Sequence, residues 1–415
     1  MNKFFTLTFC FIIAITQTLN AQIEMVSVGA NYSQQAYYTL STGEVEIVNN
    51  DAWDIAFSND GVQDAGIFLN ESGDLGANKL RLYLAPSNDF NQNITDLSAF
   101  IEENELHNKE QNWTDGAFNS LKDLYSPFDY GWGTYNPALN TVVGTNVFVI
   151  QKRDGNFIKL EITELSGTGT YSFRYANLDG TNEISKTVTK DLTGPALIHF
   201  SFETENIVTM PTDFDLVFQR YTTPLDDGYG NLLEYSVTGV LLASGVEAVA
   251  ANGVDPQTVN PELYIDQTTS TINAIGHDWK YFDFYSGWLI DENIAYFVKT
   301  KNDDYYKIVF YDFEGSATGT TTFEKTLLDI VSTEDLAQNI ETTVFPNPTT
   351  DFVTVKSEEN IESIEIYNLQ GKLMLSQLAN VNVETLNLTT LNSGIYSIII
   401  NTESAKIAKP LIVNR

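Results

Sequence analysis

Apolar and polar residues alternate in short runs along most of this chain, and Gly, Asn and Asp separate the runs. The clearest case is FVIQKRDGNFIKLEIT at 148–163, where two alternating runs flank the turn at 153–156. A period of two places successive side chains on opposite faces of a strand, and Asp-Gly supplies the positive φ that a tight hairpin requires. The pattern therefore predicts an all-β protein.

Helical spacing of apolar residues occurs in two segments. DLSAFIEENELHN at 96–108 places Leu97, Phe100 and Ile101 on one helical face, and AFNSLKDLY at 117–125 is a shorter example. We expect a helix in each segment.

The pattern also repeats. AWDIAFSN (52–59) is echoed by DFDLVFQR (213–220), and a similar strand and turn precede each, at 37–48 and 198–209. The hairpin at 148–167 likewise matches 296–315, with Lys159 aligned to Lys307. Two ordered blocks at similar spacing predict two tandem copies of one fold.

The repeat gives a predicted domain organisation. We expect a first β domain at 22–190 and a second at 191–332, although a single larger sandwich built from both copies fits the same pattern. The polar segment 333–342 has no strand pattern and is predicted to be a linker. Residues 343–415 contain four more strand patterns, including GIYSIIIN, whose two faces are both apolar, and we expect a small C-terminal β-sandwich with that strand buried on both sides.

The N-terminus has the pattern of a secretory signal peptide at 1–21. Lys3 precedes an apolar run at 4–15, and TLNAQ follows, with Ala21 as the expected last residue removed. No later apolar run is long enough for a transmembrane helix. The one cysteine, Cys10, lies inside the apolar run, so the mature chain is expected to have no disulfide, thiolate metal site or cysteine nucleophile.

Charge excludes one class of partner. The formal net charge is −33, and the charges are scattered along the chain. An anionic surface repels the phosphate backbone, so nucleic-acid binding is not expected.

The C-terminal unit resembles the type A C-terminal sorting domain of the type IX secretion system. The resemblance rests on FPNP (Phe345, Pro346, Asn347 and Pro348), IYNLQGKLM with Gly371 and Lys372, LNSGIYSIII with Gly394 and Tyr396, and the ending KPLIVNR. It implies a Gram-negative bacterium, the type IX machinery as partner, a secreted or outer-surface location, and removal of the sorting domain with release or attachment to surface polysaccharide.

The repeated units resemble the HmuY-like family of secreted haem-binding proteins. WDIAF and its echo FDLVF carry the resemblance, together with the hairpins at 148–162 and 296–309. The resemblance implies paired axial haem ligands, with the position after each motif as one place to look. Ser58 and Gln219 occupy those positions, and the three histidines, His107, His199 and His277, do not match between the copies. The residues therefore do not support haem ligation by histidine.

Motifs for catalysis are missing from the sequence. We find no G-x-S-x-G, H-E-x-x-H or phosphate-binding loop. Asp54 and Asp215 recur in the repeat and could act as acid and base, but a single carboxylate between apolar strand residues favours a structural hydrogen bond. The acidic turns at 224–231 and 301–306 lack the spacing of a known calcium loop. We predict no cofactor and no metal site.

Aromatic clusters are the best candidates for binding. HDWKYFDFYSGW at 277–288 places Trp279, Tyr281 and Tyr285 on one strand face and ends at Trp288, and the first copy has Trp132 and Tyr135. Exposed aromatic faces stack on sugar or porphyrin rings, whereas buried ones only pack a core.

These observations predict a non-catalytic surface or secreted binding protein with haem or a glycan as candidate ligand. A structural or adhesive spacer is the alternative, and an enzyme acting on extracellular polysaccharide is the weaker one.

Overall fold

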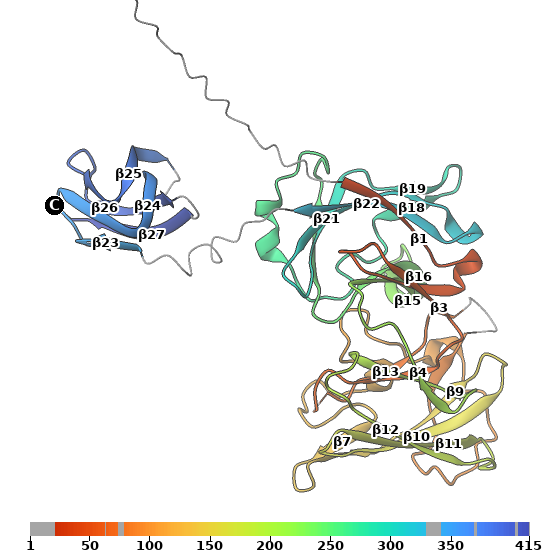
Figure 1. The fold of residues 1–415 in the computed structure, drawn as a ribbon. Coiled ribbons are helices and arrows are strands. Elements are labelled where there is room, and N and C mark those ends of the chain that lie inside the picture. The colour runs from red at the N-terminus through yellow and green to blue at the C-terminus, as the bar shows by residue number, and fades with distance from the viewer. Residues whose placement is uncertain are drawn as a thin grey trace, which may run out of the picture. The chain divides into compact units, whose positions relative to one another are not determined.

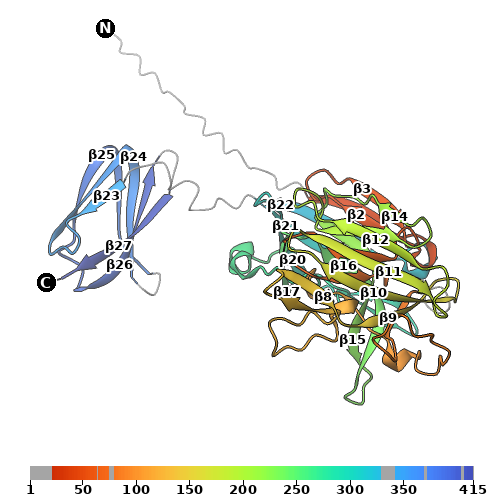
Figure 2. The same ribbon diagram turned by 90° about the horizontal axis from the view of Figure 1, so that it is seen from below.

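The structure is a computed structural model that describes residues 21–62, 64–73, 79–328, 342–368, 372–402 and 406–414. The chain forms two compact units, residues 1–328 and 329–415 (Figures 1 and 2). Most of the predicted signal peptide, most of the predicted linker and Gly371 lie outside the described residues.

The first unit contains four sheets and a two-stranded ribbon, and all of their strand pairs are antiparallel. The first outer sheet has the order β12-β11-β10-β8-β7, with β9 also on β10 and β6 on β9. Its strands are β6 (Arg81–Leu84), β7 (Gly133–Asn136), β8 (Thr141–Gly144), β9 (Val147–Gln151), β10 (Phe157–Leu165), β11 (Thr170–Asn177) and β12 (Ile184–Thr189). The first middle sheet, β14-β13-β4-β5, consists of β4 (Ile55–Ser58), β5 (Ile67–Leu69), β13 (Leu197–Ser201) and β14 (Asn206–Val208).

The other half of the unit follows the same plan. The second middle sheet, β16-β15-β2-β3, consists of β2 (Gln34–Tyr38), β3 (Val45–Asn49), β15 (Leu216–Asp226) and β16 (Leu232–Leu242). The second outer sheet, β1-β22-β21-β20-β17, consists of β1 (Ala21–Ser27), β17 (Glu247–Asn252), β20 (Ile294–Lys299), β21 (Tyr305–Phe313) and β22 (Thr320–Leu328). The ribbon is β18 (Lys280–Asp283) with β19 (Gly287–Ile290).

The sheets form four layers, which Figure 1 shows stacked in the first unit. One core lies between the first outer and first middle sheets, a second lies between the second middle and second outer sheets, and a third apolar cluster joins the two middle sheets. The motif strands explain this stack. In β4, Ile55 and Phe57 pack in the first core, while Ala56 belongs to the cluster between the middle sheets. In β15, Phe218 packs in the second core and Val217 belongs to the same cluster between the middle sheets.

Strand pairing crosses between the two halves of the sequence. Strand β4, which carries WDIAF, pairs with β13, and β15, which carries FDLVF, pairs with β2. Each middle sheet therefore combines a hairpin from one predicted copy with a motif strand from the other. Neither 22–190 nor 191–332 therefore contains all the strands of a middle sheet. The domain boundary near residue 190 remains a prediction.

Equivalent details recur in the two outer sheets. Both long hairpins have a register shift at the same place, between Ile162 and Glu164 and between Phe310 and Asp312. Lys159 donates to the carbonyl oxygen of Gln92 at 3.1 Å, and the aligned Lys307 donates to that of Pro256 at 2.8 Å. These positions support the alignment of the hairpins made from the sequence.

The two recurring aspartates have structural roles, as predicted. Asp54 accepts the backbone N–H of Phe202 at 2.6 Å and forms an ion pair with Arg153. Asp215 accepts the backbone N–H of Leu40 at 2.8 Å. Each carboxylate thus binds the end of the hairpin strand that comes from the other half of the unit.

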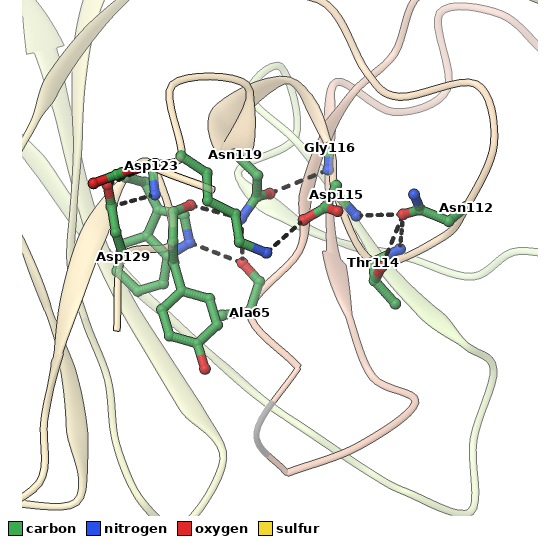
Figure 3. A network of polar contacts seen from close by, with 12 residues as sticks. Ala65, Asn112, Thr114, Asp115, Gly116, Asn119, Asp123 and Asp129 are labelled. Atoms are coloured by element: carbon green, nitrogen blue, oxygen red, sulfur yellow. Dashed lines mark hydrogen bonds and ion pairs between the residues drawn. The ribbon is translucent and has the colours of Figure 1, made fainter. Parts of the chain in front are cut away.

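The two predicted helices are wrong. The described residues contain no α-helix, and the two segments hold only the 3₁₀ turns η2 (Glu102–Asn104) and η3 (Ala117–Asn119). Figure 3 shows the reason around η3: Asn112 accepts the N–H groups of Thr114 and Asp115, and the Asn119 amide donates to the carbonyl of Ala65. Short-range bonds such as those of Asn112 compete with helical ones. The Asn119 bond instead joins η3 to a residue 54 positions away. The remaining 3₁₀ turns are η1 (Ala30–Tyr32), η4 (Pro261–Leu263), η5 (Ile265–Gln267) and η6 (Gly315–Ala317).

The second unit is a small sheet folded around its own core, in the order β23-β24-β26-β27 with β25 on β24. Its strands are β23 (Thr342–Phe345), β24 (Phe352–Asn368), β25 (Leu373–Asn387), β26 (Gly394–Thr402) and β27 (Lys406–Val413). In β26, Tyr396, Ile398 and Ile400 are buried but Ile395 is 54% exposed. The prediction that this strand is buried on both sides is therefore wrong, because its alternate residues pack on one core only.

The sorting motifs of the second unit meet in space. The Asn347 amide donates to the carbonyl of Pro410 at 2.7 Å, and its oxygen accepts the N–H of Ile412 at 2.9 Å. The opening FPNP is thereby bound to the final strand. Lys372 lies at the start of β25, and the hydroxyl of Tyr396 donates to the Asn392 carbonyl at 2.9 Å.

The two aspartates give a matched test of the crossed pairing. We expect Asp54→Asn to lower the free energy of unfolding by about 2–3 kcal/mol, because Arg153 loses its anion in a mostly buried site. Asp215→Asn should cost about 1 kcal/mol, since among the described residues no cation lies within ion-pair distance of Asp215.

Tryptophan fluorescence in urea measures this difference, because all five tryptophans lie between residues 53 and 288 and so report on the first unit. Equal losses in the two variants would contradict the role assigned to the Asp54–Arg153 pair.

Candidate functional site

Two of the predicted binding aromatics lie inside the cores. Trp132 is fully buried, and its indole N–H donates to the Ala65 carbonyl at 2.8 Å, the same carbonyl that accepts the Asn119 amide in Figure 3. Trp279 is 1% exposed and stacks on Phe310 at 4.0 Å between ring centroids. Neither ring has a face open to a ligand in this structure.

Tyr135 is separated from the other predicted residues. It packs at the edge of the first core, stacks on Phe128 and donates its hydroxyl hydrogen to Asn140 at 2.9 Å. The structure therefore does not bring the six predicted aromatics into one site.

The remaining three predicted residues belong to the β18–β19 ribbon. Tyr281 is 56% exposed, Tyr285 is 99% exposed and Trp288 is 36% exposed. Phe282 pairs across the ribbon with Trp288, and their rings meet edge to face at 5.5 Å. The ribbon thus places several large aromatic side chains at the surface of the second half.

A groove of about 790 Å³ runs beside this ribbon. Tyr281 and Trp288 line it, while Tyr285 does not. Its other walls come from the loop after β17, the segment after β19 and the register shift of β21: Asp255, Pro256, Gln257, Leu289, Ile290, Asp291, Glu292, Asn293, Val309, Phe310, Tyr311 and Asp312.

Tyr311 is the groove residue that sequence reasoning missed. It lies at the register shift between Phe310 and Asp312 and is 43% exposed. Its hydroxyl donates to Glu324 and accepts from the Gln257 amide, both at 3.1 Å. Burial and the Glu324 carboxylate raise the pKa of Tyr311, so the phenol stays protonated at neutral pH. The sequence pattern did not mark it, because the register shift that redirects its side chain is visible only in the strand pairing.

The groove is acidic and rich in hydrogen-bonding groups. Four carboxylates line it, from Asp255, Asp291, Glu292 and Asp312, and the described lining includes no Lys, Arg or His. Asp255 and Asp291 each accept a backbone N–H of their own loop at 2.9 Å. The other two carboxylates and the amides of Gln257 and Asn293 are suited to bonds with ligand hydroxyl groups.

Lys280 contacts aromatic rings at the base of the ribbon. Its ammonium lies 4.0 Å from the Trp279 ring centroid and 5.7 Å from that of Trp288, and it donates to the Thr238 carbonyl at 2.5 Å. Burial lowers the pKa of Lys280 to about 7. Trp288 is also confined by Gly315, whose position would place a Cβ atom 2.8 Å from the indole. The Trp288 indole is therefore held in place before any ligand arrives.

A second, smaller cavity of about 120 Å³ lies between the two middle sheets. Gln219 lines it, but Ser58 does not. His199 also lines it, and burial lowers the pKa of this imidazole to about 3. The other histidines lie apart: His107 contacts Glu71 at 3.0 Å, which helps to raise the pKa of this histidine against its burial, and His277 contacts the Tyr221 hydroxyl at 3.3 Å.

The described residues contain no group of three or more His, Cys, Asp and Glu side chains able to hold a metal ion. Within the same part of the chain, no helix is both long and apolar enough to cross a membrane.

Comparison with known proteins finds that two family models match parts of the chain. The secretion system C-terminal sorting domain matches residues 343–414, and the HmuY protein family matches residues 31–175. The second match runs from η1 through β11, across both middle sheets. No curated protein matches this sequence.

One solved structure is similar over part of its length. It is PorZ, described as an essential bacterial surface component of the type IX secretion system of Porphyromonas gingivalis. The identity is 11% and the TM-score 0.17, over 64% of this chain and 38% of that chain. At these values it carries no argument, and this chain spans well under half of the PorZ chain. The sorting-domain match covers residues 343–414 of the second unit and marks the chain as a protein exported to the cell surface or secreted.

Proposed function

We propose that this exported chain is a non-catalytic binding protein that recognises a neutral or amino-sugar glycan in the groove beside the β18–β19 ribbon. The observation that carries the proposal is the juxtaposition of Tyr281, Trp288 and Tyr311 with carboxylates and amides in one groove of about 790 Å³. Drug-sized ligands occupy roughly 300–1,000 Å³, so the groove has room for a short oligosaccharide.

The chemistry of the groove supports a sugar. Pyranose rings present C–H groups that pack on aromatic faces and hydroxyl groups that need polar partners. A fixed indole at Trp288 lowers the entropy cost of that packing. The carboxylates and the net charge of −33 disfavour uronic acids and sulfated glycans, because like charges repel in a groove without a cation in its described lining.

These observations favour a glycan over haem as the ligand. His199 lines a cavity of about 120 Å³ and His107 lines one of about 10 Å³, and both are smaller than a porphyrin requires. Each described lining contains a single histidine, so a pair of axial imidazoles would have to come from residues that lie elsewhere.

The experiments below also distinguish a spacer and a polysaccharide hydrolase from a binding protein. A spacer would bind no glycan at all. A polysaccharide hydrolase would need two carboxylates in acid and base roles, and Asp255 and Asp291 already bind their own loops. Cleavage by a signal peptidase after Ala21, removal of the sorting domain and attachment of the product to surface polysaccharide belong to the proposal as well.

Glycan-array screening of the full chain tests the proposal. We expect neutral and amino-sugar oligosaccharides to bind, and Trp288→Ala to weaken the best ligand about tenfold, which is about 1.4 kcal/mol. Tyr285→Ala is the matched control, because this residue is on the same ribbon and is 99% exposed but does not line the groove.

A loss of equal size in Tyr285→Ala would move the site to the ribbon tip. Absence of any glycan binding would favour the spacer, and release of reducing ends would favour the enzyme.

Haemin titration is the second test. We expect no shift of the Soret band on adding the full chain, since the described histidines do not converge. A coordinated haem spectrum that disappears in His199→Ala would contradict this expectation and make haem the ligand.

A further inference from the structure

We propose that the cavity between the two middle sheets binds one small, uncharged aromatic molecule that carries a hydroxyl group. This site is separate from the glycan groove, because the residues that line the two spaces do not overlap. The ligand class follows from the size of the cavity, its aromatic walls and its one neutral imidazole.

The size admits a single ring. The cavity measures about 120 Å³, and engineered apolar cavities of about 150 Å³ bind benzene in other proteins. Six aromatic side chains line it: Tyr37, Trp53, Phe68, Trp113, Phe214 and Tyr221. A planar ring in this space would make dispersion contacts with these aromatic walls.

The polar atoms of three aromatic side chains in the cavity wall already form hydrogen bonds within the protein. The Tyr37 hydroxyl donates to Gln35 at 2.8 Å, and the Trp53 indole N–H lies 3.3 Å from the same oxygen. The Trp113 indole N–H donates to the Leu242 carbonyl at 2.9 Å. These three side chains therefore offer the ligand their apolar ring surfaces.

His199 supplies the polar contact. Its ring meets Trp53 edge to face at 4.6 Å, and the side chain is 9% exposed. A neutral imidazole has one donor and one acceptor nitrogen, so His199, which lines the cavity, can donate to or accept from the ligand hydroxyl. Gln219, which also lines the cavity, can donate and accept as well.

Charge at the cavity favours a neutral ligand. Lys109, Lys301 and Arg220 line it together with Glu71 and Glu110, so the charges nearly balance. Arg220 already donates to the Gly73 carbonyl at 3.0 Å and lies 4.8 Å from the Tyr32 ring centroid. The Lys301 ammonium lies 5.8 Å from the Phe214 ring centroid. An ion moved from water to these aromatic walls would lose its hydration without a dedicated counter-ion, which an uncharged phenol avoids.

Fluorine NMR of 4-fluorophenol with the full chain tests the proposal. We expect saturable binding that phenol displaces and cyclohexane does not. Val217→Phe fills the cavity from β15 and should weaken binding at least twentyfold. His199→Phe keeps a ring in place but removes the polar contact, so it should weaken phenol at least fivefold and leave benzene binding unchanged.

A second filling variant guards against a folding defect in Val217→Phe. Ala196 lines the same cavity but is half-buried, so Ala196→Phe should block the ligand with less strain on the layers. Tyr285→Ala, on the distant ribbon, should bind 4-fluorophenol as the unaltered chain does. Non-saturable binding, or binding that survives Ala196→Phe in a folded protein, would overturn the proposal.

Discussion

Burial of the two middle sheets on both faces is the constraint on which the rest of the structure depends. Each middle sheet has an outer sheet on one side and the other middle sheet on the opposite side. Strands in that position need side chains suited to burial at every residue rather than at every second one. WDIAF and FDLVF meet this need, and Asp54 and Asp215 bind the hairpins that complete each sheet.

Crossed pairing makes the two halves of the first unit depend on each other. A hairpin from each half completes the middle sheet of the other, so the layers cannot separate without breaking backbone hydrogen bonds in both middle sheets. The described residues contain no cysteine, and this pairing supplies a constraint that disulfides supply in many other exported proteins. The Asp54–Arg153 pair adds a charged contact at one of the two junctions.

The surface of the second half differs from that of the first half in its exposed aromatic side chains. The β18–β19 ribbon occupies the same place in the strand order as β7–β8, yet it carries exposed Tyr281, Phe282 and Phe284, and a groove opens beside it. Lys280 and Gly315 hold Trp288 at the wall of this groove. Similar strand order with different surface residues is one way to place a different surface groove on a stable scaffold.

Strand alternation and short motifs in the sequence determined the all-β class, the roles of Asp54 and Asp215 and the sorting unit, because a period of two and fixed turn residues are local properties. Local pattern failed at 96–108 and 117–125, where the side chains of Asn104, Asn108 and Asn119 bind the backbone instead. Only the tertiary structure decided that Trp132 and Trp279 are buried while Tyr281 and Trp288 line a groove with Tyr311, since burial depends on which layer covers a strand. Only it showed that the motif strands pair with hairpins from the opposite half, because strands with equivalent edges can pair within a copy or between copies.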